Sequence, residues 1–238
     1  MRFAVISDIH GNIEALTAVL ADIRRRGTNQ VFCAGDLVGY GPFPNEVIEL
    51  IRRDGIPAVM GNYDDAVAYG RPMCGCAFPD ARARELGEQS LAWTQAHTTE
   101  DNKAFLRSLP RQLRFRTGPY EVLVVHASPR FLDEYLYEDA PADLLQEIFT
   151  ACPVDILIVG HTHKPYHRKF AGRHIINAGS AGKPKDGDPA AVYAIVDAGH
   201  EVRVTFPRVS YNVTRVARAI EEAGLPLEFA RQLLAGRE

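Results

Sequence analysis

Short apolar runs alternate with amphipathic segments along the chain, and the two patterns predict different elements. Consecutive apolar residues predict strands buried on both faces, whereas apolar positions spaced by three and four residues predict helices. Strands are expected at residues 3–6, 30–34, 56–60, 113–116, 122–125, 155–159, 166–170, 174–177, 191–197 and 201–206. Helices are expected at residues 12–26, 44–53, 141–150 and 212–224, within 64–109, and after residue 226.

The order of these elements predicts an α/β fold. The first strand, the helix after it and the second strand form a unit in which both strands run parallel, joined by a right-handed crossover. Strands dominate the second half of the chain up to residue 206, and helices follow at residues 212–234. Because no internal repeat or linker interrupts this order, residues 1–238 are expected to form a single domain.

Polar residues follow several predicted strands at the points where these strands end. In open α/β sheets, ligands bind beyond the carboxyl ends of the strands. Taken alone, the Asp8-Ile9-His10 triplet is as compatible with a helix N-cap followed by a surface histidine as with a pair of metal ligands. Seven such residues at five successive strand ends instead favour a shared site. They are Asp8, His10, Asp36, Asn62, His126, His161 and His163.

The chemistry of these seven side chains indicates a metal site. Oxygen and imidazole ligands without cysteine suit Mn²⁺, Fe or Zn²⁺ better than a structural zinc. Seven ligands are too many for one ion, but they suit two ions that share a bridging carboxylate, roughly 3.5–4 Å apart. Two cations neutralise the charge of a phosphoester and lower the pKa of a water molecule between them. The sequence therefore predicts two-metal hydrolysis of a phosphoester.

Five segments, in this order, resemble the motifs of the calcineurin-like metallophosphoesterases. The resemblance covers residues 3–206, and residues 177–184 are similar to a segment of the small bacterial phosphodiesterase branch. It implies a four-layer α/β/β/α sandwich of two mixed β-sheets flanked by helices. The five segments are Ser7-Asp8-Ile9-His10-Gly11, Gly35-Asp36-Leu37-Val38-Gly39-Tyr40-Gly41, Gly61-Asn62, Val125-His126-Ala127 and Gly160-His161-Thr162-His163.

The resemblance also implies a role for each ligand. The first metal ion would be held by Asp8, His10, Asp36 and His163. The second would be held by Asp36, Asn62, His126 and His161, with Asp36 bridging. A water or hydroxide between the ions would attack phosphorus in line, so Asp36, Asn62 and His126 count as catalytic. Mn²⁺ is the metal expected first, with Fe, Zn²⁺ and Ni²⁺ as alternatives.

Tyr63 departs from the family pattern. Many members carry histidine after the Gly-Asn pair, where it is assigned to protonate the leaving group or to stabilise the transition state. A phenol with a pKa near 10 is a poorer acid at neutral pH, although it can donate a hydrogen bond. Tyr63 is therefore a catalytic candidate, with a packing role as the alternative, and Asp64, His97 and His167 are candidate substitutes. A preference for diesters with good leaving groups is the expected consequence.

Candidate substrate contacts lie in two glycine-containing loops. Ser180, Lys183 and Lys185 follow a predicted strand, where backbone N–H groups and ammonium groups suit a phosphate. Solvated surface lysines are the alternative interpretation. Tyr40 is expected to border the pocket. Arg71, Arg82 and Arg130 are further candidates.

Composition narrows the biological setting. A formal net charge of −3 argues against non-specific binding of long nucleic acid. No apolar run approaches the length of a membrane span. No signal-peptide pattern precedes the first strand, and the four cysteines are scattered, so a cytoplasmic chain with reduced thiols is expected. Cys74-Gly75-Cys76 lacks the second pair of a zinc knuckle. The oligomeric state is left open, homo-oligomers included.

The predicted function is hydrolysis of a small phosphorylated substrate, first of all a phosphodiester. Dinucleoside polyphosphate hydrolysis and protein Ser/Thr phosphatase activity are the enzymatic alternatives, and a protein phosphatase is expected to carry the histidine that Tyr63 replaces. A metal-binding interaction module on the same fold is the non-enzymatic alternative. Such modules are expected to lose metal ligands, whereas all seven are present here.

Overall fold

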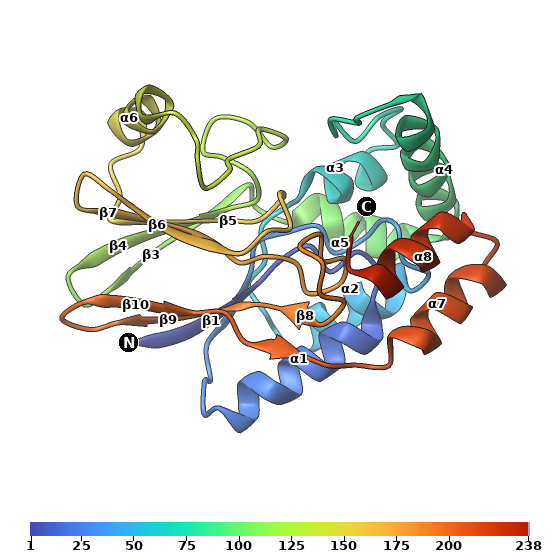
Figure 1. Ribbon diagram of the computed structural model, residues 1–238, viewed down its shortest axis with the longest axis horizontal. Helices are drawn as coiled ribbons and strands as arrows, with labels where there is room; N and C mark the ends of the chain where they lie inside the picture. Colours follow the sequence, from blue (N-terminus) through green and yellow to red (C-terminus); the bar gives the residue numbers. More distant parts are fainter. Residues whose placement is uncertain (238) are drawn as a thin grey trace.

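The computed structural model describes residues 1–237, and its strands form two main sheets and a two-stranded ribbon (Figure 1). The first sheet contains, in spatial order, β10 (Val202–Thr205), β9 (Ala194–Ala198), β1 (Arg2–Ile6) and β2 (Val31–Cys33). The second sheet contains β3 (Gln112–Thr117), β4 (Tyr120–Val125), β5 (Ile156–Val159), β7 (Arg173–Asn177) and β6 (Tyr166–Phe170). The ribbon pairs β8 (Ala191–Val192) with β11 (Arg208–Val209).

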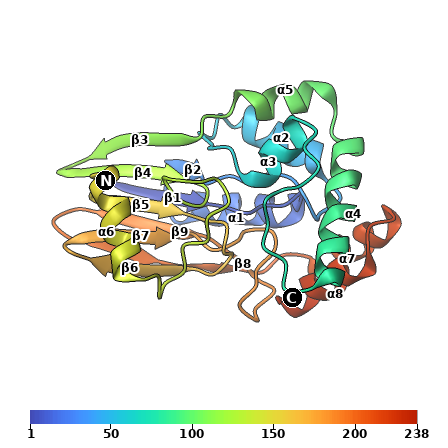
Figure 2. The same ribbon diagram turned by 90° about the horizontal axis from the view of Figure 1, so that it is seen from above.

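Helices cover the outer faces of the sheets and one end of the molecule. In Figures 1 and 2, α1 lies under the first sheet, α6 lies above the second, and α3, α4, α5, α7 and α8 gather beyond one end of the strands. The helices are α1 (Ile13–Arg25), α2 (Pro44–Arg53), α3 (Asn62–Ala68), α4 (Ala81–His97), α5 (Glu100–Ser108), α6 (Ala142–Ala151), α7 (Val213–Glu222) and α8 (Leu227–Ala235). Within residues 1–237, none of these helices has the length and apolar character that a bilayer span requires.

The apolar runs in the strands supply cores on both faces of each sheet. Side chains alternate along a strand, so neighbouring residues enter different cores. Phe3 of β1 and Val124 of β4 meet in the core between the sheets. Ile6 of β1 packs toward α1 and α2, whereas Leu123 of β4 packs toward α6. The predicted four-layer α/β/β/α sandwich is therefore confirmed.

Both sheets are mixed, as predicted. In the first sheet β1 runs parallel to β2 and antiparallel to β9. In the second, β5 runs parallel to β4 and β7, and β3 and β6 are antiparallel edge strands. The parallel pairs β1–β2 and β4–β5 place four loops that carry predicted ligands at one end of the sandwich.

Two strand predictions are wrong. Residues 56–60 do not form a strand: only the bridge between Cys33 and Ala58 forms beside β2, and Pro57 has no N–H to extend the ladder. Residues 191–197 do not form one strand either, because β8 pairs with β11 while β9 pairs with β1 and β10. Tyr193 lies at the break and donates a hydrogen bond to Asp22 at 2.8 Å. A continuous apolar run does not reveal that the chain passes from one sheet to another.

Backbone hydrogen bonds tie the loops of the candidate site together. The amide of Asp8 donates to Gly35 at 3.0 Å, and the amide of His10 donates to Asp36 at 3.0 Å. The amide of Gly182 donates to the carbonyl of Asp8 at 3.0 Å. A Cβ atom on Gly182 would lie 1.7 Å from the carbonyl oxygen of Ile9, so only glycine permits this approach.

Candidate metal centre

Six predicted ligands form two buried groups at the carboxyl ends of the strands. Asp8, His10 and His163 make up one group, and Asp36, His126 and His161 make up the other. Within each group the ligand atoms lie within 4.8 Å of one another. One carboxylate oxygen, Oδ2 of Asp36, lies 3.7 Å from Nε2 of His10 and 3.5 Å from Nε2 of His126. Asp36 thus lies between the two groups, as a bridging ligand requires.

Backbone carbonyls set the orientation of three imidazoles. Nδ1 of His10 donates to Val38 O at 2.9 Å, Nδ1 of His126 to Ala34 O at 2.8 Å, and Nδ1 of His163 to Lys183 O at 2.5 Å. Because a carbonyl only accepts, these contacts place the ring proton on Nδ1. In its neutral form, each ring then presents the lone pair of Nε2 to the site, which is the arrangement found in metal-binding histidines.

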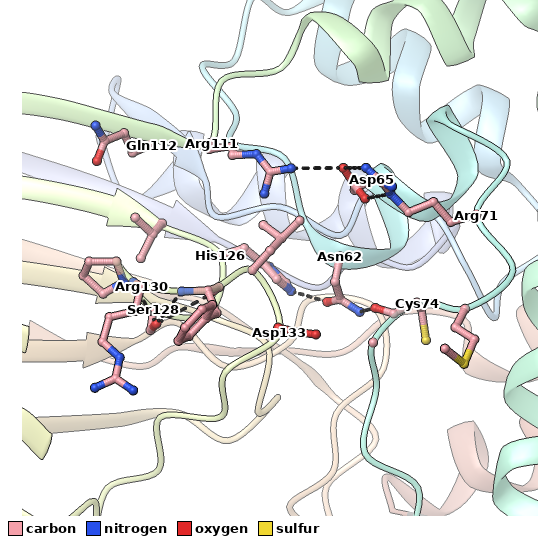
Figure 3. Close-up of a pocket in the computed structure, with 16 residues that line it drawn as sticks. Asn62, Asp65, Arg71, Cys74, Arg111, Gln112, His126, Ser128, Arg130 and Asp133 are labelled. Carbon is pink, nitrogen blue, oxygen red and sulfur yellow. Dashed lines mark hydrogen bonds and ion pairs between the residues drawn. The ribbon is translucent and has the colours of Figure 1, made fainter.

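Several of these lone pairs face one another. Nε2 of His10 lies 3.2 Å from Nε2 of His163, and Nε2 of His126 lies 2.8 Å from Oδ1 of Asn62 (Figure 3). The amide nitrogen of Asn62 donates to Cys74 O at 2.9 Å, which leaves its oxygen toward the site. Within residues 1–237, the buried Oδ1 of Asp8 and Nε2 of His161 have no hydrogen-bond partner. Shared cations would satisfy this set of acceptors, so the side chains fit divalent metals.

Burial governs the protonation of the centre. It lowers the pKa of His10, His161 and His163 well below the usual histidine value, which keeps these rings neutral at pH 7. Burial also raises the pKa of Asp8 to about 7. The pKa of Asp36 is raised well above its usual range by burial and by the carboxylate of Asp64. Bound cations would reverse the preference for neutral carboxyl groups.

The backbone at the centre is strained. Within residues 1–237, the non-glycine residues with left-handed φ are Ala171 and six residues of the site. The six are Asp8 (φ 52°), His10 (49°), Asp36 (54°), Tyr40 (58°), His161 (64°) and His163 (60°). Each such conformation costs on the order of 1–3 kcal/mol in a non-glycine residue, and it persists where the surrounding structure holds it. This clustering is independent structural support for a functional site.

Asp64 organises two of the ligand loops. Its carboxylate accepts the N–H groups of Asp36 (2.9 Å), Leu37 (2.9 Å), Val38 (3.3 Å) and Gly61 (2.9 Å). These bonds fix the loop after β2 and the start of α3, where Asn62 lies. The oxygens of Asp64 are therefore engaged, and the expectation that Asp64 replaces the leaving-group acid is wrong.

The other expected substitutes for that acid lie outside the centre. The ring of His97 stacks on Trp93 with centroids 3.9 Å apart, and its Nδ1 bonds to Trp93 O at 2.7 Å. His167 bonds to Nδ1 of His174 at 2.8 Å. Neither histidine lines a pocket at the centre. His97 and His167 are thus excluded as leaving-group acids.

Tyr63 is buried beside the first group of ligands. Its ring lies edge-on to His10, with centroids 5.5 Å apart, and 4.8 Å from the ring of Tyr40. A Cβ atom on Gly39, whose φ is +97°, would lie 2.4 Å from Cδ1 of Tyr63, so glycine makes room for the ring. Burial raises the pKa of Tyr63 well above its usual value. The packing role is therefore evident, and the phenol is a weak acid.

Two pockets adjoin the centre and meet at Asn62. The first, the aromatic pocket, has a volume of about 250 Å³ and is lined by Tyr40, Tyr63, Phe78, Tyr135 and Phe229 together with His10, Asp36, His161 and His163. The second, the arginine pocket, has a volume of about 700 Å³ and is lined by Asp65, Arg71, Arg111, Arg130 and His126, among others (Figure 3).

All of the predicted substrate contacts except Ser180 line one of the two pockets. Tyr40 and Lys183 line the aromatic pocket, with Nζ of Lys183 4.6 Å from the centroid of the Tyr40 ring. Lys185 and Arg82 line the same pocket, and Arg71 and Arg130 line the arginine pocket. Tyr135, Phe229 and Arg111 were not predicted, because nothing in their local sequence distinguishes them from core or surface residues.

Ser180 lies beneath the pocket and does not line it. Its hydroxyl donates to Asp8 O at 2.7 Å and accepts the N–H of Lys183 at 2.8 Å. The amides of Ala181 and Gly182 donate to Ser7 O and Asp8 O. The expected phosphate contacts through Ser180 and through these N–H groups are therefore wrong: the loop supports the backbone around Asp8.

Comparison with known sequences identifies the family. Residues 1–201 match the sequence profile of the calcineurin-like phosphoesterase superfamily domain. The chain belongs to this superfamily. Membership identifies it as a metal-dependent phosphoric ester hydrolase, in agreement with the two groups of buried ligands.

Similar proteins match this chain over nearly its whole length. An uncharacterized protein of Methanocaldococcus jannaschii is 35% identical, with 98% of each chain covered. The crystal structure of a metallophosphoesterase from Sphaerobacter thermophilus is 35% identical, with a TM-score of 0.79 and with 99% of this chain and 100% of that chain covered. A hypothetical protein from Pyrococcus horikoshii is 25% identical, with a TM-score of 0.85 and with 100% of this chain and 99% of that chain covered.

Proposed function

We propose that this phosphoesterase hydrolyses small phosphodiesters with two divalent cations, Mn²⁺ first. The observation that carries the proposal is Oδ2 of Asp36, which lies 3.7 Å and 3.5 Å from the Nε2 atoms of His10 and His126. Asp8, His10, Asp36 and His163 would hold one ion, and Asp36, Asn62, His126 and His161 the other. Bound there, the cations would neutralise phosphoester charge and lower the pKa of water.

The two pockets favour a diester over a monoester. A phosphodiester carries two ester arms on one phosphorus, and Asn62 lines both the aromatic and the arginine pocket. A monoester would use only one of them. The aromatic pocket, at about 250 Å³, is smaller than the roughly 300–1,000 Å³ of sites for drug-sized ligands, which favours a small leaving group over a phosphoprotein.

Three residues of the aromatic pocket are proposed to contact the substrate. Lys183 lies over the ring of Tyr40, where its ammonium group can meet a phosphate oxygen. Tyr40 and Tyr135 offer aromatic faces to the leaving group.

The four cysteines are free, which supports a reducing compartment and the proposed cytoplasmic location.

Tyr63→Phe is expected to change kcat less than about threefold for good and poor leaving groups alike, because a phenol with a raised pKa contributes little general acid catalysis. The phenol stays protonated from pH 6 to 9, so the pH–rate profiles of the variant and the wild type should coincide. The measurement is kcat for 4-nitrophenyl and alkyl esters over that pH range. A selective loss on the alkyl ester would show that Tyr63 protonates the leaving group.

A panel of substrates with defined metals tests the proposed function. Bis(4-nitrophenyl) phosphate, 4-nitrophenyl phosphate, a dinucleoside tetraphosphate and a phosphopeptide would each be assayed with Mn²⁺, Fe²⁺, Ni²⁺, Zn²⁺ and Mg²⁺ on chelator-stripped protein. We expect the highest kcat/KM on the diester with Mn²⁺, and no turnover with the chelator present. Preference for the tetraphosphate or the phosphopeptide would replace the proposal. Binding of two metal ions with no turnover would favour an interaction module.

A further inference from the structure

The arginine pocket holds two guanidinium groups on one carboxylate. Arg71 donates from Nε and Nη2 to Asp65, the latter bond measuring 3.2 Å, and Arg111 donates from Nη2 to Asp65 at 3.3 Å (Figure 3). The side chain of Asp65 is 9% exposed, whereas those of Arg71 and Arg111 are 49% and 62% exposed. Two positive charges thus share one buried negative charge, so this cluster carries one positive charge in excess.

Asp65 positions these arginines without using all of their donors. A guanidinium carries five N–H groups in a planar fork that matches the oxygens of a phosphate, sulfonate or carboxylate. Asp65 engages Nε and Nη2 of Arg71 and Nη2 of Arg111. The remaining N–H groups are donors that Asp65 does not engage, and holding the forks in place lowers the conformational entropy lost when an anion binds.

This pair lies close to the metal centre. Asp65 follows Asn62 by three residues in α3, so the two side chains share one face of the helix, with Cβ atoms about 5–6 Å apart. Asn62 and His126 line the same pocket as Arg71 and Arg111. An anion on the two arginines would therefore lie in the pocket that two predicted metal ligands also line.

The other charged residues of the pocket do not duplicate the pair. Arg130 also lines it, but its guanidinium pairs with Glu134 at 2.9 Å and with Glu147 at 2.9 Å. Asp133 adds a negative charge to the lining. Asp133 offsets the excess charge over the lining as a whole, but at the cluster of Arg71, Arg111 and Asp65 one positive charge is in excess.

We propose that Arg71 and Arg111 form a subsite for a second anionic group of the substrate. The inference rests on the proposed phosphodiesterase function and names its substrate class: diesters with one small leaving arm in the aromatic pocket and a second arm that ends in an anion. The shared chemistry of that anion is a planar or tetrahedral set of oxygens, as in phosphate, sulfonate or carboxylate.

Two matched diesters test this subsite in the Mn²⁺-loaded protein. Both release 4-nitrophenolate, and their second arms are 3-sulfopropyl and 3-hydroxypropyl, which share the propyl chain and end in an anionic sulfonate and a neutral hydroxyl. For the wild type we expect a KM about tenfold lower for the sulfopropyl diester, since charge-assisted pairing with arginine favours binding. Equal KM values for the two diesters would overturn the proposal.

Single substitutions test whether the difference in KM between the two diesters arises at Arg71 and Arg111. Arg71→Ala and Arg111→Ala are each expected to raise KM for the sulfopropyl diester about five- to tenfold. The kcat values, and KM for the hydroxypropyl diester, are expected to change less than about twofold. Arg24→Ala is the matched control, because Arg24 is an exposed arginine paired with Asp54 at 2.8 Å in a different part of the surface. Equal losses on both diesters would contradict a subsite for the anion.

The same experiment separates failure of the subsite from failure of the proposed function. Turnover of the hydroxypropyl diester tests diester hydrolysis by itself, and the ratio between the two diesters tests the subsite. If neither diester is cleaved, the proposed function fails, and calorimetric binding of both diesters still tests the subsite. Tighter binding of the sulfopropyl diester that is lost in Arg71→Ala would support the subsite, and equal binding would overturn it.

Discussion

Replacing Asp36 with asparagine is expected to lower kcat on the diester about a thousandfold, equivalent to about 4 kcal/mol of transition-state stabilisation. The substitution keeps the size of the side chain and an oxygen at Oδ1, which accepts the N–H of Tyr63 at 2.9 Å. At Oδ2 it places an amide NH₂ between the lone pairs of His10 and His126. An NH₂ group donates hydrogen bonds and does not ligate a cation, so the link between the two ligand groups is lost.

The measurement combines kcat with the metal content per chain, which is expected to fall by one ion or more. Asp197→Asn is the matched control, since Asp197 is an exposed carboxylate paired with Arg2. The metal-free Asp36→Asn variant should melt at or above the temperature of metal-free wild type, because burial raises the pKa of Asp36 and so disfavours its charge. Full activity in the variant would remove Asp36 from the bridging position.

Asp64→Asn is expected to lower the free energy of unfolding by about 3 kcal/mol and kcat by at least about tenfold. The carboxylate accepts the N–H groups of Asp36, Leu37, Val38 and Gly61. An asparagine retains one acceptor and turns an NH₂ group toward N–H donors, so buried donors lose their partners. The loops that carry Asp36 and Asn62 then lose their common anchor.

Chemical denaturation and kcat measure the two effects. Asp22→Asn is the matched control. Asp22 lies in α1, away from the centre, and its largely buried carboxylate accepts hydrogen bonds from Arg25, Arg26 and Tyr193. It should cost about 1 kcal/mol and leave kcat unchanged. If Asp64→Asn lowers stability but leaves kcat at the wild-type value, Asp64 does not position the ligands.

The sequence predicts the centre well because its residues follow strands. Asp8, Asp36, His126 and His161 each lie within three residues of the end of an apolar strand, and parallel strands end at a common edge. The four-layer fold follows from the same runs, whose alternate residues enter different cores. Residues 56–60 have the composition of a strand, but Pro57 lacks the N–H group that a strand ladder needs. For this segment the strand prediction is wrong, whereas the prediction that Asn62 lies at the centre is correct.

The pockets could not be predicted in this way. Arg111 and Asp65 are separated by 46 residues, and Phe229 reaches the ring of Tyr40, 5.2 Å away, from the C-terminal helix α8. No local pattern links such residues, because their proximity depends on how whole helices pack. The role of Asp64 was missed for a related reason: its partners are backbone N–H groups, which carry no sequence signal.

The left-handed backbone of the ligand residues affects how the stability of this chain can evolve and be engineered. At Asp8, His10, Asp36, His161 and His163 the conformation suits glycine better than the residue present, so selection for stability and selection for catalysis act in opposite directions. Stability screens on this protein should therefore enrich inactive chains with glycine at ligand positions. A search for robust active variants must select for turnover from the first round.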